Sequence, residues 1–324
     1  MPPRIKRLIM SSMAAMLGGI VAPVGLSADP VTVSEAFVTN QNGDSLTIVS
    51  LADMKPLAEI PIGGKPAGVA MAPDGRRAYL TSPNSKELVI VDAAARQVTG
   101  RLKVSEGPLG IAAHPTNGRV YVADWFAHKV SVIDPSVPKV VAEIGVGESP
   151  SGLAVSPDGK LLLSADRDSD AVSIIDTQTN ARIGTVPVGK RPFGITIDAK
   201  GERAYTANVA SDDMSVVDIA SGKLIGNVPV GHRPYAVALA GQHAYVTNQY
   251  ASTVSVIDVG SLKVVRTIEV GDHPEGIEAD PSGANVYVAC WFDNVLMRID
   301  TATMAVSGEA AVGDGPRAFG RFLR

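Results

Sequence analysis

Short runs of alternating apolar and polar residues recur along the chain from about residue 35, separated by turns rich in Gly, Pro, Asp and Asn. Residues 110–144 show the unit, in which GIAAH, RVYVAD, KVSVID and KVVAEI follow one another. A period of two with Val, Ile, Tyr and Thr at the apolar places is typical of β-strands. The pattern therefore predicts units of four short antiparallel strands, and no helix beyond the N-terminal segment.

These units repeat at a nearly constant interval. A proline in a V-G-x-x-P setting returns every 42 residues, with one interval of 40, and an aspartate that ends a V-x-[VI]-[IV]-D run returns at the same intervals. Four-stranded units of roughly 40 residues are typical of β-propeller blades. The seven prolines are Pro66, Pro108, Pro150, Pro192, Pro234, Pro274 and Pro316.

The two ends of the repeat array complement each other. Residues 35–60 contain three strand-like runs, and residues 316–324 contain a single one. Pairing them would complete a last blade and leave no free inner edge. We therefore expect residues 28–324 to form an all-β, seven-bladed propeller of four-stranded antiparallel blades, with the C-terminal strand closing the ring against the N-terminal strands.

The repeat also resembles a known family. FVTN at 37–40, YVTN at 245–248 and degenerate copies such as YLTS and YTAN, with P-x-G upstream and VSVID downstream, resemble the YVTN-repeat β-propellers of exported bacterial proteins. The resemblance covers essentially residues 28–324 and implies the propeller fold. Members range from envelope proteins to surface-layer proteins and domains of redox enzymes, so the resemblance implies no single activity.

The N-terminal segment differs from the rest of the chain. Three basic residues precede an apolar stretch at 8–26, and small residues follow it. This arrangement predicts a secretory signal peptide at 1–27 and a periplasmic or secreted protein. An uncleaved membrane anchor is the alternative, but two glycines and a proline inside a stretch of barely spanning length argue against it.

Charge and motif content narrow the function classes. Without the signal peptide the chain has 26 basic and 33 acidic residues, a formal charge of −7, which disfavours nucleic acid and anionic membranes as partners. Cys290 is the only cysteine, so no intramolecular disulfide forms. The motifs C-x-x-C-H, G-x-S-x-G and H-E-x-x-H do not occur, and we expect no cofactor, no metal and a monomer.

The sequence offers two weaker metal hypotheses. The acidic run at 166–170 has the spacing of a calcium loop, but Ala171 and Thr177 stand where that loop needs Gly and Glu. A cation shared with Asp212 and Asp213 remains an alternative to a solvated turn. Cys290 takes a repeat position that Asn40, Asp124, Asn208 and Asn248 hold in other units, without partners at ligand spacing, which favours a partly buried structural thiol.

Candidate binding residues gather on one face, which we call the top face. It carries the turns between the second and third strands of each blade and the connections between blades, and the other side is the bottom face. Aromatic and basic residues in these turns and connections predict a binding surface for a ligand or a partner protein. The alternative is that each aromatic ring packs over the core. The predicted binding residues are Trp125, Phe126, Arg191, Phe193, Arg233, Tyr235, Tyr250, Trp291 and Phe292.

The sequence thus favours an exported propeller that binds a small ligand or a partner protein on its top face. The alternative is an enzyme, either a lactonase-like hydrolase or an accessory protein of periplasmic quinoprotein oxidation. In the hydrolase, His232 or His273 would act as the base, while Glu275 and Arg317 would position a carbonyl or carboxylate.

Overall fold

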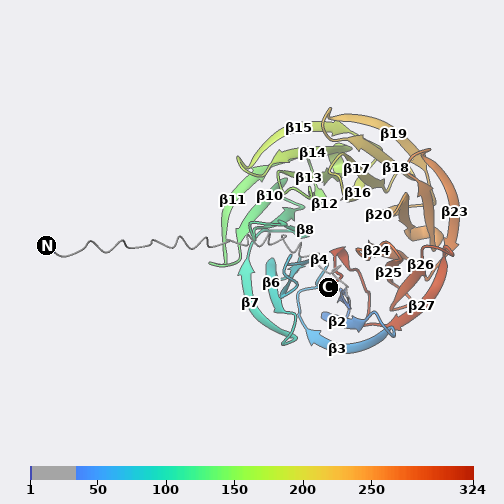
Figure 1. Cartoon of the computed structure of the whole chain (residues 1–324). Helices are drawn as coiled ribbons and strands as arrows, with labels where there is room; N and C mark the ends of the chain where they lie inside the picture. Colours follow the sequence, from blue (N-terminus) through green and yellow to red (C-terminus); the bar gives the residue numbers. More distant parts are fainter. Residues whose placement is uncertain (2–33) are drawn as a thin grey trace. The chain divides into compact units, whose positions relative to one another are not determined.

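The computed structural model describes residues 34–324 together with Met1. The predicted signal peptide therefore lies, Met1 apart, outside the described residues. Within them, no helix is long and apolar enough to cross a membrane. The 28 strands of the described residues form seven sheets arranged around a ring (Figure 1), which confirms the predicted seven-bladed β-propeller.

Six blades are continuous in the chain, and each is an antiparallel sheet whose strands follow sequence order from the ring centre outward. Blades 1 to 3 comprise β4 (Gly68–Met71), β5 (Arg77–Ser82), β6 (Glu87–Asp92) and β7 (Gln97–Lys103); β8 (Pro108–Ala113), β9 (Val120–Asp124), β10 (Lys129–Asp134) and β11 (Lys139–Gly145); and β12 (Pro150–Val155), β13 (Leu161–Asp166), β14 (Ala171–Asp176) and β15 (Ala181–Pro187).

Blades 4 to 6 follow the same plan. They comprise β16 (Pro192–Ile197), β17 (Arg203–Asn208), β18 (Asp213–Asp218) and β19 (Lys223–Pro229); β20 (Pro234–Ala240), β21 (His243–Asn248), β22 (Thr253–Asp258) and β23 (Lys263–Glu269); and β24 (Pro274–Ala279), β25 (Asn285–Cys290), β26 (Val295–Asp300) and β27 (Ala305–Ala311).

Blade 7 joins the two ends of the array. Its outer three strands are β1 (Glu35–Asn40), β2 (Ser45–Ser50) and β3 (Lys55–Pro61). The C-terminal segment runs antiparallel to β1, with bridges from Asn40 to Pro316 and from Ala36 to Leu323. Within this segment, β28 (Phe319–Arg321) also pairs in parallel with β4 of blade 1. The C-terminal strand therefore closes the ring, as predicted, and the C-terminus lies inside it (Figure 1).

The repeat residues hold neighbouring blades together. The glycine of P-x-G allows the innermost strands to touch, since a Cβ added at Gly110 would lie 1.7 Å from the carbonyl oxygen of Ser151 in the next blade. The threonine of the repeat also joins innermost strands of neighbouring blades. In blades 1 and 2, Thr81 Oγ1 accepts a hydrogen bond from Gly68 N of β4 (2.8 Å) and donates one to Leu109 O of β8 (2.7 Å). The repeat motif is thus explained by packing between blades.

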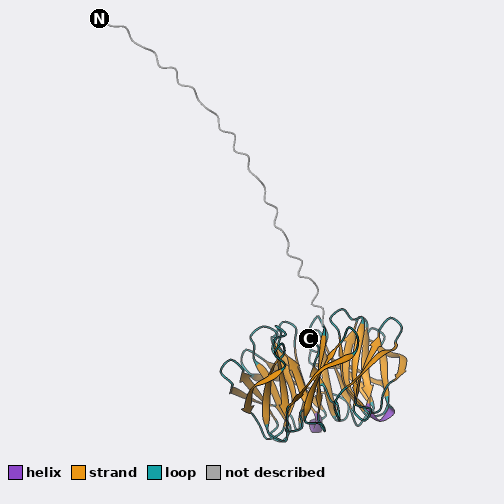
Figure 2. Ribbon diagram, turned by 90° about the horizontal axis from the view of Figure 1, so that it is seen from below, coloured by secondary structure: helices purple, strands orange, loops and turns teal. Residues whose placement is uncertain are grey.

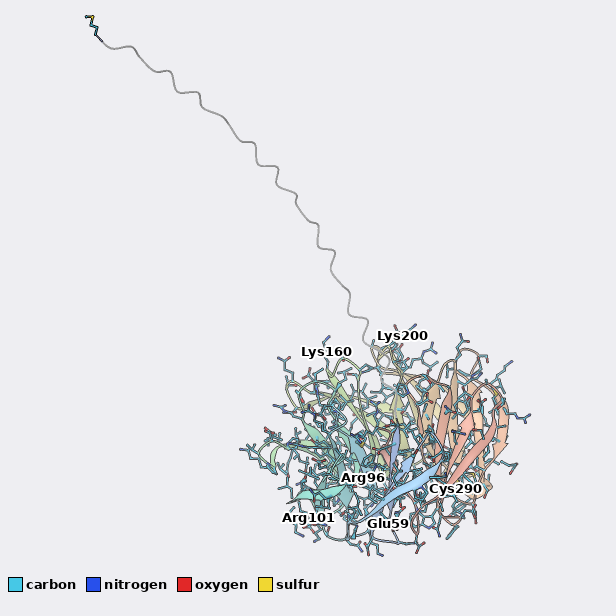
Figure 3. All side chains as sticks on the ribbon, turned by 60° about the horizontal axis from the view of Figure 1, so that its bottom comes forward. Glu59, Arg96, Arg101, Lys160, Lys200 and Cys290 are labelled. Atoms are coloured by element: carbon cyan, nitrogen blue, oxygen red, sulfur yellow. The ribbon has the colours of Figure 1, made fainter. Side chains whose placement is uncertain are left out.

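The two faces differ in the structure. In Figure 2 two short 3₁₀ turns, η1 (Arg167–Ser169) and η2 (Gln249–Ala251), lie on one side of the disc, and the C-terminus lies toward the other. The turns belong to the top face because each connects the second and third strands of its blade. In Figure 3 Lys160 and Lys200 lie on the bottom face, while Cys290 lies near the top face.

Candidate functional site

Aromatic side chains fill the centre of the ring near the top face. The ring of Phe319 lies 5.0 Å from that of Phe193 and 5.6 Å from that of Tyr235, and Phe193 and Tyr235 are 4.5 Å apart. All three side chains are buried. Half-buried Trp125 adds a fourth ring, 6.3 Å from Phe193. These four rings, here called the aromatic floor, connect blades 2, 4 and 5 with the C-terminal strand.

A polar network lies beside the aromatic floor. The guanidinium of Arg317 donates from Nε and Nη2 to Tyr235 Oη (2.8 and 2.6 Å) and from Nη1 to Gln41 Oε1 (3.0 Å). Its Nε also lies 3.2 Å from Glu275 Oε2. Gln249 Nε2 donates to the other oxygen of Glu275, Oε1, at 2.6 Å. The network therefore ties blades 5, 6 and 7 together around one buried carboxylate.

Burial dominates the electrostatics of this carboxylate. It raises the pKa of Glu275, and the Arg317 guanidinium opposes that rise. Within the described residues Glu275 Oε2 accepts no hydrogen bond of ordinary geometry, although the guanidinium is beside it. Glu275 and Arg317, predicted to position a substrate, thus lie together, but their polar atoms mainly bind other protein groups.

A second set of rings lies on the top face of blades 5 and 6, and all but half-buried His273 are exposed. Tyr250, in η2, lies 5.5 Å from His232 on one side and 5.3 Å from His273 on the other. The row ends at Phe292, which meets His273 edge-on at 4.4 Å. The Arg233 guanidinium lies 4.8 Å from the centroid of Tyr250, at cation–π distance. We call His232, Tyr250, His273 and Phe292 the ring row.

Each histidine of the ring row contacts an aspartate. His232 Nδ1 lies 3.0 Å from Asp212 Oδ2, and His273 Nδ1 lies 2.8 Å from Asp272 Oδ1. The hydrogen bond with His273 holds the pKa of Asp272 below its usual value. A carboxylate at Nδ1 fixes the imidazole orientation and directs Nε2 away from it.

The remaining predicted site residues lie farther around the top face. Phe126 is exposed, and Trp125 carries the Arg167 guanidinium 5.3 Å from its ring centroid. Arg191 is exposed, and its Nε lies 3.9 Å from Asp168 Oδ1. Trp291 is half-buried, and its backbone N–H donates to His273 O at 3.0 Å. Of the predicted binding residues, the structure thus gathers Trp125, Phe193 and Tyr235 into the floor and Tyr250 and Phe292 into the ring row, while Phe126, Arg191, Arg233 and Trp291 belong to neither.

Sequence reasoning assigned no site role to Phe319, Gln249, Gln41 or Arg167. The sequence places Phe319 only within the strand-like run at 316–324, and its reach across the ring depends on the path of that strand. Gln249 and Gln41 directly follow repeat asparagines, at places equivalent to Trp125 and Trp291. Comparing that repeat position across blades would have identified the two glutamines.

The structure shows the surroundings of Asp166 and Cys290, the residues of the two metal hypotheses. Asp166 is buried and accepts hydrogen bonds from Ser164 Oγ, Ser173 Oγ and Gly147 N, so it is not a solvated turn residue. In the part of the chain that the structure describes, no three His, Cys, Asp or Glu side chains cluster closely enough to hold a metal ion. Cys290 is fully buried, which raises the pKa of its thiol to about 12.

Comparison with solved structures gives the same fold. The chain is similar to the hydrazine synthase of Kuenenia stuttgartiensis (22% identity, TM-score 0.71, covering 78% of this chain and 88% of that one). It is similar to a protein of unknown function from Desulfotomaculum acetoxidans (17%, 0.75, 87% and 98%). It is also similar to the dihydro-heme d1 dehydrogenase NirN in complex with DHE (15%, 0.65, 94% and 77%).

These similarities, together with the seven closed sheets, define the class of protein as a β-propeller. No family model and no curated protein matches the sequence. The resemblance to the YVTN-repeat family therefore stays a prediction. At these identities the solved structures show the fold alone.

Proposed function

We propose that this protein is a scaffold whose top face binds a partner protein. The observation that carries the proposal is the exposure of three top-face rings, Phe126 (68%), Tyr250 (54%) and Phe292 (60%). Every other aromatic residue among residues 34–324 is buried or half-buried. Exposed aromatic side chains with arginines nearby are typical anchors of protein interfaces.

The centre of the ring favours a partner protein over a small ligand held in the channel. Phe319, Phe193 and Tyr235 fill the channel below the top face and leave Glu275 buried beside them. A ligand approaching from this face would meet packed rings. The exposed anchors instead lie on blades 2, 5 and 6, and this wide spacing suits an extended protein surface.

The proposed location is the cell envelope. The support for it is the basic, apolar and small-residue pattern of residues 1–27, which is typical of an exported protein. A partner would then be another periplasmic or secreted protein.

Replacing the exposed rings tests the proposal. We expect the variant Phe126→Ala, Tyr250→Ala, Phe292→Ala to fold normally and to lose a defined partner that co-purifies, after mild cross-linking in the native envelope, with the unaltered protein. The matched control is Val141→Ala, Ile183→Ala, Val265→Ala, which removes exposed apolar side chains from the outer strands. Equal recovery of the partner with both variants would contradict a top-face site.

A hydrolase is the second candidate because of the Asp–His pairs in the ring row. A base whose Nδ1 contacts a carboxylate has the arrangement of a general base held in place. The purified protein would then hydrolyse a lactone substrate, and His232→Ala or His273→Ala would remove turnover. Turnover that survives both changes, or none in the unaltered protein, would exclude this candidate.

A further inference from the structure

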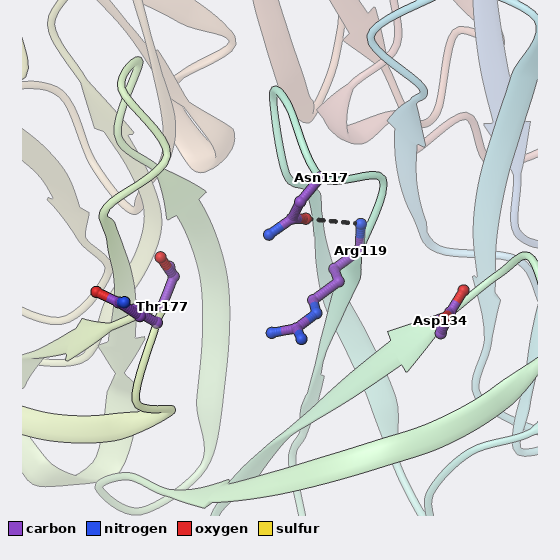
Figure 4. A pocket seen from close by; sticks show the side chains of 5 residues that line it. Asn117, Arg119, Asp134 and Thr177 are labelled. Atoms are coloured by element: carbon purple, nitrogen blue, oxygen red, sulfur yellow. Dashed lines mark hydrogen bonds between the residues drawn. The ribbon is translucent and has the colours of Figure 1, made fainter.

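A polar cavity opens on the bottom face, remote from the predicted top-face residues. It has a volume of about 490 Å³ and lies between blades 2 and 3 (Figure 4). Small-molecule sites commonly have volumes of about 300–1,000 Å³. We call it the blade 2–3 cavity, and its lining residues are Asn117, Arg119, Asp134, Thr177 and Gln178.

The backbone carbonyl of Gly159 links the two sides of the cavity, because it contacts His114 of blade 2 and Thr177 of blade 3. Gly159 O lies 2.9 Å from His114 Nε2 and accepts a hydrogen bond from Thr177 Oγ1 at 2.5 Å. The other ring nitrogen of buried His114 accepts the backbone N–H of Asn117 at 3.2 Å and so holds the turn that precedes Arg119. The cavity is therefore built from turns already held in place without a ligand.

Arg119 projects its guanidinium into this space (Figure 4). Within residues 34–324 the guanidinium forms no ion pair and no hydrogen bond of ordinary geometry; it lies beside the buried hydroxyl of Tyr121, and its charge partly offsets the rise that burial causes in the pKa of Tyr121. The repeat supplies a direct comparison, because Arg203 holds the same place in blade 4. Its Nη1 donates to Val259 O of the next blade at 3.3 Å. Arg119 thus retains donors that its counterpart uses between blades.

A negative charge lies on the same cavity. Asp134 Oδ1 accepts hydrogen bonds from Ser136 N (2.9 Å) and Oγ (2.6 Å), whereas Oδ2 has no hydrogen-bond partner within the described residues. Asp134 and Arg119 form no ion pair with each other, although both line the cavity. The amide of Gln178 adds a further donor without a side-chain partner among residues 34–324.

Two opposite charges that face one cavity without pairing are suited to a ligand that carries both complementary charges. A guanidinium binds a carboxylate through parallel N–H donors, and a carboxylate accepts N–H donors from an ammonium group. We propose that the blade 2–3 cavity binds a small zwitterion of the α-amino acid type, with its carboxylate at Arg119 and its ammonium group at Asp134. This site is independent of the top-face partner.

Matched probes separate the two charges. L-alanine carries both groups, propionate lacks the ammonium group, and ethylamine lacks the carboxylate. Binding to the purified full-length chain is measured by the ligand's NMR line broadening and by calorimetry, with L-serine and L-glutamine as further zwitterions. We expect at least one zwitterion to bind about tenfold or more tightly than propionate or ethylamine, because it makes two charged contacts instead of one.

Variants locate the site. Arg119→Ala should weaken zwitterion binding about tenfold or more, and Arg119→Lys should weaken it less because the charge remains. Asp134→Asn should reduce the preference for zwitterions over propionate. Arg203→Ala is the control and should bind as the unaltered protein does, with circular dichroism confirming that all variants fold. The proposal is overturned if no zwitterion exceeds propionate and ethylamine, or if Arg119→Ala and Arg203→Ala bind equally well.

Discussion

The ring of Phe319, in the C-terminal strand, lies 5.0 Å from the ring of Phe193, in the innermost strand of blade 4. The contact joins the end of the chain to a blade across the ring centre, in addition to the backbone hydrogen bonds that the same segment makes with blade 7. Ring closure therefore depends on side-chain packing as well as on strand pairing.

Removing this packing should destabilise the whole propeller. Phe319→Ala deletes a buried ring and leaves a cavity, and we expect unfolding free energy to fall by about 3–5 kcal/mol in chemical denaturation. Deleting residues 316–324 should abolish the cooperative transition or cause aggregation, since it also exposes the edge of β1. Phe126→Ala, at an exposed ring, is the control and should change stability by only about 0.5 kcal/mol. A truncated chain with an unchanged melting curve would contradict this closure.

The carboxylate of Glu278 in blade 6 binds the C-terminal end of the closing strand. Its Oε2 accepts the backbone N–H groups of Phe322 (2.5 Å) and Leu323 (2.8 Å). Glu278→Ala leaves both donors without this acceptor, and we expect a loss of about 1–3 kcal/mol for each donor that stays buried. Urea unfolding measures the effect. Arg321→Ala removes the exposed partner of the same carboxylate and should cost less than about 1 kcal/mol. Equal effects of the two changes would show that Glu278 acts through its ion pair.

The fold could be predicted because its determinants are local and repeated. Strand alternation, the turn residues and the 42-residue interval each specify the blade, and the incomplete ends specify closure. For the candidate site, the sequence predicted which face of the disc each residue lies on, but not whether its side chain is buried or exposed. Strand register assigns Phe193 and Tyr250 to the same side of the disc, yet Phe193 is buried and Tyr250 is exposed. Orientation depends on contacts such as that with Phe319, which come from distant parts of the chain.

His114 shows the same limit on the bottom face. The repeat register assigns it to a bottom-face turn, where side chains are commonly exposed, and the structure places it in that turn with its side chain buried. Its repeat counterpart in blade 3, Ser156, also accepts a turn N–H, from Leu161 at 3.0 Å. The imidazole also reaches Gly159 O of the next blade, at 2.9 Å, which a serine cannot do.

Acid should weaken the protein through His114. Burial lowers the pKa of this imidazole, and its Nδ1 must be unprotonated to accept the turn N–H groups. The unfolded chain gains a proton near pH 6.5, and the folded chain only at lower pH. The stabilising contribution is therefore complete above about pH 6.5 and is lost as the pH falls below it.

Urea midpoints between pH 7.5 and 5 measure this dependence. We expect His114→Ser, which copies the residue of blade 3, to show a shallower decline than the unaltered protein. His243→Ser is the control at a half-buried bottom-face position and should keep the original slope. An unchanged slope in His114→Ser would assign the acid sensitivity to other groups.

Cys290 should be chemically silent in the folded protein. Its side chain is fully buried, and burial raises the pKa of the thiol to about 12, so the reactive thiolate is scarce at neutral pH. At pH 8 we expect no reaction with a thiol-specific reagent until denaturant is added, and then one equivalent per chain. Rapid labelling of the native protein would show that the top-face end of β25 opens.

Site-specific photo-cross-linking in the native envelope tests the proposed scaffold most directly. A photoreactive residue would be placed at position 126 or 292 on the top face, and at position 160 or 200 on the bottom face (Figure 3). We predict that one and the same partner protein is cross-linked from positions 126 and 292 and not from 160 or 200. Cross-linking of that partner from the bottom face alone, or equally from both faces, would contradict binding to the top face.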